Sequence, residues 1–159
     1  MRLRVHWMVA LAGIAVASLI ALALAWKPAA PTTGHRLRPD DASVVARGER
    51  VYRAHCASCH GARLEGQPNW REFGADGRLP APPHDASGHT WHHPDDVLFK
   101  LTKVGLARMT GAKNANSAMP VFEGVLSDDD IVAVLSWIKA QWPAEVRQRH
   151  DQLNLQTQR

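Results

Sequence analysis

The sequence contains very little cysteine and little excess charge of either sign. Only two of its 159 residues are cysteines, and Cys56 and Cys59 lie in one short stretch. A zinc site built from two cysteine pairs is therefore excluded, and a disulfide across so short a span would restrain little of the chain. The formal net charge of +4 at pH 7 is too small to indicate a nucleic-acid-binding domain. The chain length predicts one domain with an appendage.

The two cysteines belong to the stretch Cys56-Ala57-Ser58-Cys59-His60. This C-x-x-C-H pattern is typical of covalent c-type haem attachment. Its two thiols can add to the two vinyl groups of one haem, and the adjacent His60 can bind the iron as the proximal ligand. A redox disulfide is an alternative, but the strands of the βαβ unit that usually surrounds it are missing from the sequence pattern. The motif therefore predicts one covalently bound haem c.

The sequence on both sides of this motif resembles the class I cytochrome c family, the monohaem cytochromes of bacteria. Gly48 and Tyr52 stand at the family's offsets before the first haem cysteine, and Met119-Pro120 resembles its downstream methionine segment. Residues 127–142 resemble its closing amphipathic helix, so that the resemblance covers residues 41–143. It implies an all-α cytochrome c fold, with three main helices and long loops around one covalently bound haem that is attached outside the cytoplasm.

Hydrophobic periodicity and capping residues predict helices over residues 40–55, 94–105 and 127–141. Gly48 lies inside the first of these helices, where glycine costs about 1 kcal/mol relative to alanine. We therefore expect another helix to approach closely at this position, and the family resemblance implies that this is the last one. Ser127 is expected to cap the last helix through a capping box.

The resemblance also implies a set of residues around the haem. His60 and Met119 would bind the iron, with Met109 as the alternative sixth ligand. The proline after Met119 restricts this segment to extended backbone, so that no helix hides the sulfur. The Pro82 carbonyl would accept the Nδ1 proton of His60, and the side-chain N–H of Trp91 could reach a haem propionate.

Four histidines follow the haem motif within a short stretch. They are His84, His89, His92 and His93, and His84 stands where the family usually has a leucine. Such side chains could bind copper or zinc, or supply the sixth iron ligand. Only His89 and His93 are four residues apart, and they precede the helix predicted from residue 94, so no pair has the i, i+4 spacing on a regular helix. The sequence therefore favours polar residues ahead of a helix over a second metal site.

The N-terminal residues 1–26 have the pattern of a targeting segment. Arg2 and Arg4 precede an uncharged apolar stretch of 20 residues from Trp7 to Trp26, which is long enough to span a bilayer as a helix. The sequence favours a retained membrane anchor with its N-terminus in the cytoplasm. A cleaved signal peptide is the alternative, and either would place the rest of the chain in the periplasm.

The remaining chain divides into three parts. Residues 27–39 are rich in proline and predict a linker with little that could pack. Residues 40–143 predict the cytochrome c domain. Residues 144–159 are polar, and we expect a short helix or a frayed tail there.

The predicted ligands determine the predicted function. Because His60 and Met119 together would leave no open iron position, the haem would transfer electrons and would not activate oxygen or peroxide. We therefore predict a one-electron carrier and not an enzyme, working between a donor and an acceptor protein of a respiratory chain. Two alternatives stay open: a haem enzyme with an open iron position, and a copper-binding module that uses the histidines between His84 and His93.

Overall fold

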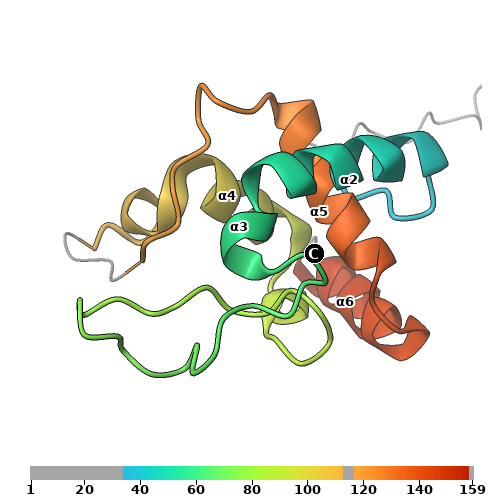
Figure 1. Cartoon of the computed structure of the whole chain (residues 1–159). Coiled ribbons are helices and arrows are strands. Elements are labelled where there is room, and N and C mark those ends of the chain that lie inside the picture. Colours follow the sequence, from blue (N-terminus) through green and yellow to red (C-terminus); the bar gives the residue numbers. More distant parts are fainter. Residues whose placement is uncertain (1–33, 113–116, 158–159) are drawn as a thin grey trace, which may run out of the picture. The chain divides into compact units, whose positions relative to one another are not determined.

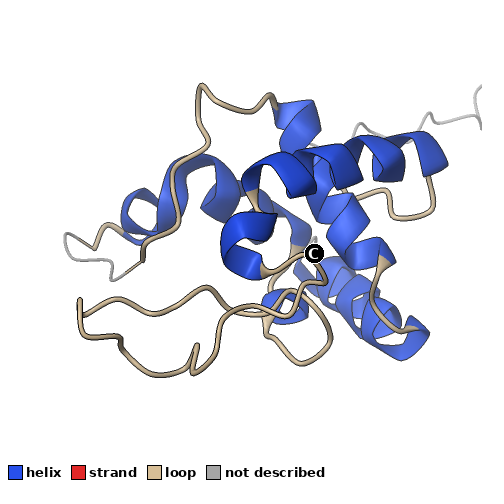
Figure 2. Ribbon diagram, in the orientation of Figure 1, coloured by secondary structure: helices blue, strands red, loops and turns tan. Residues whose placement is uncertain are grey.

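The computed structural model describes residues 34–112 and 117–157 of the chain. The described residues form helices joined by loops, and Figure 2 shows no strand among them. The helices are α2 (Ala42–His55), α3 (Ala57–His60), the 3-10 helix η1 (Thr90–His92), α4 (Asp95–Thr110), α5 (Asp128–Ala140) and α6 (Ala144–Thr157). The predicted all-α fold is therefore confirmed.

Helices α2 and α5 cross each other in close contact (Figure 1). Gly48 lies at the crossing, where a Cβ atom would stand 2.0 Å from the carbonyl oxygen of Ala133 and 2.8 Å from the Cβ of Trp137. Tyr52 is fully buried one turn later, with its ring 4.6 Å from that of Trp137. The close approach predicted at Gly48 is therefore confirmed, and the helix that approaches is α5, which corresponds to the predicted helix over residues 127–141. Any side chain at this position would push α2 and α5 apart.

Helix α5 has the start that the sequence predicts. The Ser127 side chain accepts a hydrogen bond from the backbone N–H of Asp130, whose carboxylate accepts one from the backbone of Ser127. This capping box satisfies two helix-end donors. The helix then buries Ile131, Val134 and Ile138 in the core.

Helix α4 is longer than the sequence predicts. Its predicted end, Gly105, adopts φ 77° and ψ 162°, which breaks the helical conformation, but the chain resumes its helical path as far as Thr110. The kink leaves the carbonyl of Lys103 free to accept the backbone N–H of Glu123 at 2.8 Å. Glycine permits this left-handed φ, so that the residue bends the helix instead of ending it.

A fourth long helix, α6, occupies the region predicted as a polar tail. Val146 and His150 are buried on one of its faces. Asn154 bonds with Asp95 at the start of α4, both through its amide nitrogen to the carboxylate and through its oxygen to the backbone N–H. Hydrophobic periodicity underestimates the length of this helix, because the helix is held largely by hydrogen bonds of polar side chains, which the periodicity does not reveal.

The end of the predicted linker is also packed. Leu37 is only 4% exposed and belongs to the core, and its backbone N–H donates to Asp95. The His35 ring stacks on that of Phe99, with 3.4 Å between their centroids. The packed part of the chain therefore begins before residue 40, because the carboxylate of Asp95 accepts the backbone N–H of Leu37.

The earlier N-terminal residues, with the predicted membrane anchor and most of the linker, lie outside the described residues. Within the described part, no helix has the length and apolar character needed to cross a membrane.

Candidate haem-binding site

The C-x-x-C-H motif forms a single helical turn, α3, directly after α2. Cys56 joins the two helices, and its carbonyl accepts the backbone N–H groups of Cys59 and His60 at 3.1 and 2.9 Å. Both cysteines are free thiols, and Cys56 is half-buried while Cys59 is exposed. Burial, followed by the neighbouring Cys59, raises the pKa of Cys56 to about 11. The turn therefore presents two free thiols beside one imidazole, with no disulfide between them.

His60 has its metal-binding nitrogen defined by one hydrogen bond. Its Nδ1 lies 2.8 Å from the carbonyl oxygen of Pro82, the partner that the resemblance implies. A carbonyl only accepts, so Nδ1 carries the proton and Nε2 keeps its lone pair. Burial lowers the pKa of His60, and the bond to Pro82 opposes this shift. A neutral, buried imidazole with a free Nε2 is the form that binds iron.

The loop that carries Pro82 is held tightly from two sides. A Cβ at Gly66 would lie 2.4 Å from the backbone nitrogen of Pro83, and a Cβ at Gly88 would lie 2.0 Å from the Pro83 carbonyl oxygen. The backbone N–H of Gly66 also donates to the carbonyl of His60 at 2.8 Å. The position of the Pro82 carbonyl is therefore set by backbone packing, which only glycine at these two places permits.

His84 lies against His60 and does not lie in a separate cluster. The two rings stack with 3.9 Å between centroids and 21° between planes. The Nδ1 of His84 lies 2.8 Å from the hydroxyl of Thr90. Burial, then the charges of His60 and His89, place the pKa of His84 well below its usual value. Stacked rings cannot hold the two opposite positions of one iron, so His84 is excluded as the sixth ligand if His60 is the fifth.

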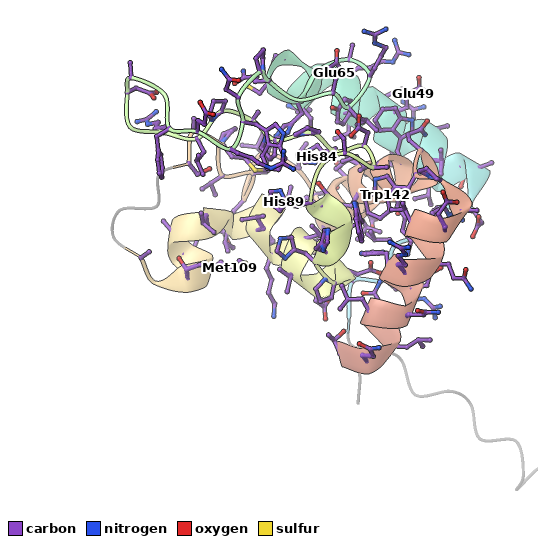
Figure 3. All side chains as sticks on the ribbon, turned by 90° about the horizontal axis from the view of Figure 1, so that it is seen from below. Glu49, Glu65, His84, His89, Met109 and Trp142 are labelled. Atoms are coloured by element: carbon purple, nitrogen blue, oxygen red, sulfur yellow. The ribbon has the colours of Figure 1, made fainter. Side chains whose placement is uncertain are left out.

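Three residues that fix His84 have no signal in the sequence. The backbone N–H of His84 donates to the carbonyl of Leu64 at 2.8 Å, and its carbonyl accepts the indole N–H of Trp142 at 2.7 Å (Figure 3). Leu64 adopts a left-handed φ of 68° while 3% exposed, a conformation that a leucine holds only where packing compensates its cost. Thr90 completes this set of contacts.

Met119 lies on the loop between α4 and α5. Its half-buried side chain packs against the apolar core that also contacts Cys56 and Ala57. Phe122, three residues later, meets the ring of His55 edge-on at 6.4 Å, which brings the segment beside the end of α2. Met109 instead lies on the turns of α4 beyond the kink (Figure 3). The structure thus brings Met119 and Cys56 onto one core.

Trp91 is half-buried and packs against the same core. Its indole N–H already donates to the carbonyl of Ala86 at 3.3 Å, and its ring lies 3.7 Å from that of His92. A bond to a haem propionate would have to compete with the Ala86 carbonyl. This role therefore stays a prediction.

The remaining histidines do not converge. His89 and His93 meet edge-on with centroids 5.6 Å apart, while His92 turns to Trp91. Across residues 34–112 and 117–157, no group of three or more His, Cys, Asp and Glu side chains is arranged to hold a metal ion. The copper-binding alternative thus gains no support from this part of the chain.

The fold and the site together define a c-type cytochrome domain: a helical frame, a C-x-x-C-H turn, and a buried histidine with Nε2 free to bind iron. Residues 43–138 match the family model described as cytochrome c oxidase, cbb3-type, subunit III. The chain belongs to this family. Comparisons with curated proteins and with solved structures gave no match.

Family membership supports the general predictions made from the sequence. It implies covalently bound haem c, a role in electron transfer and the need for redox partners. The residues present fit this cofactor, because the thiols are unpaired and the His60 tautomer is that of a metal ligand. Helix α6 and residues 34–38 lie outside the matched range.

Proposed function

We propose that the protein is a monohaem one-electron carrier in which Cys56 and Cys59 hold the haem and His60 and Met119 bind the iron. The observation that carries the proposal is the hydrogen bond from His60 Nδ1 to the Pro82 carbonyl. It fixes the tautomer that leaves Nε2 for iron, and it makes the imidazole a stronger donor.

Met119 is the better candidate for the sixth ligand. Its side chain shares the core contacted by Cys56, whereas Met109 follows the kink in α4. With both axial positions filled, the site would exchange electrons through the haem edge and would not open to oxygen or peroxide. Methionine as the ligand would also favour ferrous iron and give a higher reduction potential than histidine.

The setting of this activity is proposed from the N-terminal sequence and the family description. The apolar stretch from Trp7 to Trp26 supports a haem domain exported to the periplasm and anchored to the cell membrane. The family description names a subunit of an oxidase, which makes a membrane-bound oxidase a candidate partner. Electron transfer within a respiratory chain is consistent with both.

The sixth ligand provides the direct test. Met119→Ala should open the iron site of the ferric holoprotein, lower its reduction potential and remove the weak long-wavelength absorption of an iron–thioether bond. Met109→Ala is the matched control and should leave this band in place. Retention of the band in Met119→Ala would assign the ligand to another residue. Its absence from the wild type at neutral pH would instead favour an open or differently ligated iron, and with it the enzyme alternative.

A further inference from the structure

The face of the His60 ring is covered by a second imidazole. The centroids of His60 and His84 are 3.9 Å apart and their planes are nearly parallel, at 21°. The hydrogen bond to Pro82 holds His60 at one edge only. A single bond of this kind fixes the direction in which Nδ1 points, but it leaves the ring free to tilt about the line from nitrogen to oxygen.

The His84 ring is itself held firmly enough to remove this freedom. Its Nδ1 is tied to the hydroxyl of Thr90 at 2.8 Å, and Thr90 is only 6% exposed. Its backbone is fixed on both sides, by the carbonyl of Leu64 and by the indole of Trp142. A side chain anchored at its backbone and at its far edge presents a rigid flat surface to its neighbour.

We propose that His84 is a positioning residue for the iron ligand: its stacked ring, tied to Thr90, sets the plane of the His60 imidazole and stabilises the oxidised state of the centre. The inference rests on the iron ligation proposed above for His60. It explains why a histidine is useful at a place where an aliphatic side chain would fill the volume but supply no flat surface and no tether.

The effect on the oxidised state follows from the face that His84 presents. Oxidation makes the iron and its imidazole ligand more positive. An aromatic face attracts positive charge, whereas an aliphatic side chain does not. The stack should therefore favour ferric over ferrous iron and lower the reduction potential, acting against the effect expected of Met119.

The experiment compares four variants of the holoprotein by redox titration at one pH and by EPR of the ferric state. His84→Leu should raise the reduction potential and shift the g values, which depend on the orientation of the axial imidazole. His84→Phe keeps a flat ring without the tether, so its potential should stay closer to that of the wild type. Thr90→Val keeps the stack but frees the edge of the His84 ring, and it should broaden the EPR signals because the g values become more widely distributed. His92→Leu is the matched control, because His92 is exposed and its ring lies tilted against that of Trp91, outside the stack of His60 and His84; it should change neither readout.

The outcomes separate a positioning role from simple packing. Equal potentials and g values in the wild type and His84→Leu would overturn the proposal, as would equal shifts in His84→Leu and His92→Leu. A potential in His84→Phe that matches His84→Leu would show that the flat ring is not responsible. If His84→Leu fails to assemble, His84→Phe and Thr90→Val still decide the question through their g values. A wild type without low-spin histidine–methionine spectra would refute the proposed ligation itself, which is a different failure.

Discussion

Replacing Gly48 by alanine should destabilise the domain, although the same change in an ordinary helix would stabilise it. Alanine is favoured over glycine in a helix interior by about 1 kcal/mol. Here the added Cβ would stand 2.0 Å from the carbonyl oxygen of Ala133, 2.6 Å from its carbonyl carbon and 2.8 Å from the Cβ of Trp137. These are backbone or first side-chain atoms, so no change of rotamer can remove the overlap.

The expected size follows from how far the helices must move. Contacts below about 3 Å are essentially forbidden for carbon, so α2 and α5 would have to separate by about 1 Å along the interface that contains the Tyr52 and Trp137 rings. Overpacking of this kind costs about 1–3 kcal/mol. After the propensity gain, Gly48→Ala should lose about 1 kcal/mol of unfolding free energy and Gly48→Leu about 2 kcal/mol.

Thermal unfolding of the haem-loaded protein measures this loss. One kcal/mol corresponds to about 4 °C in Tm for a domain of this size, so the two variants should melt about 4 °C and about 8 °C below the wild type. Ala46→Leu adds more bulk than Gly48→Ala on an exposed position of the same helix and should change unfolding free energy by less than about 0.5 kcal/mol. A Gly48→Ala variant as stable as the wild type, or more stable, would refute the reasoning, because helix propensity would then outweigh the contact.

Two further predictions concern other parts of the chain. Burial, then the nearby Lys139, lowers the pKa of His150 from its ordinary value, so the unfolded chain binds a proton at this residue more readily than the folded one. The contribution of His150 should therefore leave the stability unchanged at neutral pH and above and reduce it as the pH falls into the acid range, and His150→Gln should show a smaller drop in Tm between pH 7 and pH 5 than the wild type. An equal drop in both would show that His150 does not contribute. For the N-terminal segment, fractionation with N-terminal sequencing should recover the full chain in the membrane with its haem domain exposed outside the cytoplasm, whereas a soluble periplasmic form beginning near Trp26 would select the cleaved signal.

Local sequence signals were sufficient wherever one residue type meets a strict physical requirement. Gly48 could be assigned to a helix crossing because glycine is costly inside a helix and must be offset by a contact. The capping box at Ser127 was predicted for a similar reason, since helix ends need specific side chains. The C-x-x-C-H motif indicates its cofactor because few other chemistries need that spacing.

The sequence was a weaker guide where contacts join distant and polar segments. The kink at Gly105 exposes the Lys103 carbonyl to the backbone N–H of Glu123, and the backbone N–H of Leu37 donates to Asp95. Both contacts depend on partners far along the chain. Hydrophobic periodicity detects an apolar face, but α6 buries His150 with a hydrogen bond to the backbone carbonyl of His93. His84 illustrates the same limit: its place among neighbouring histidines suggested a cluster, whereas its partners are His60 and Thr90.

The residues beyond the family match have a direct connection to the proposed site. Trp142 follows the matched range of residues 43–138, and its indole N–H holds the carbonyl of His84 at 2.7 Å. His150, on α6, holds the carbonyl of His93 at 2.9 Å, at the other end of the same loop and helix η1. The stretch from His84 to His93 is thus held at one end by Trp142 and at the other by His150, while Thr90 between these points is tied to the His84 ring. Because this stretch begins just after Pro82 and carries the imidazole stacked on His60, residues beyond the matched range are connected to the surroundings of His60 through backbone hydrogen bonds.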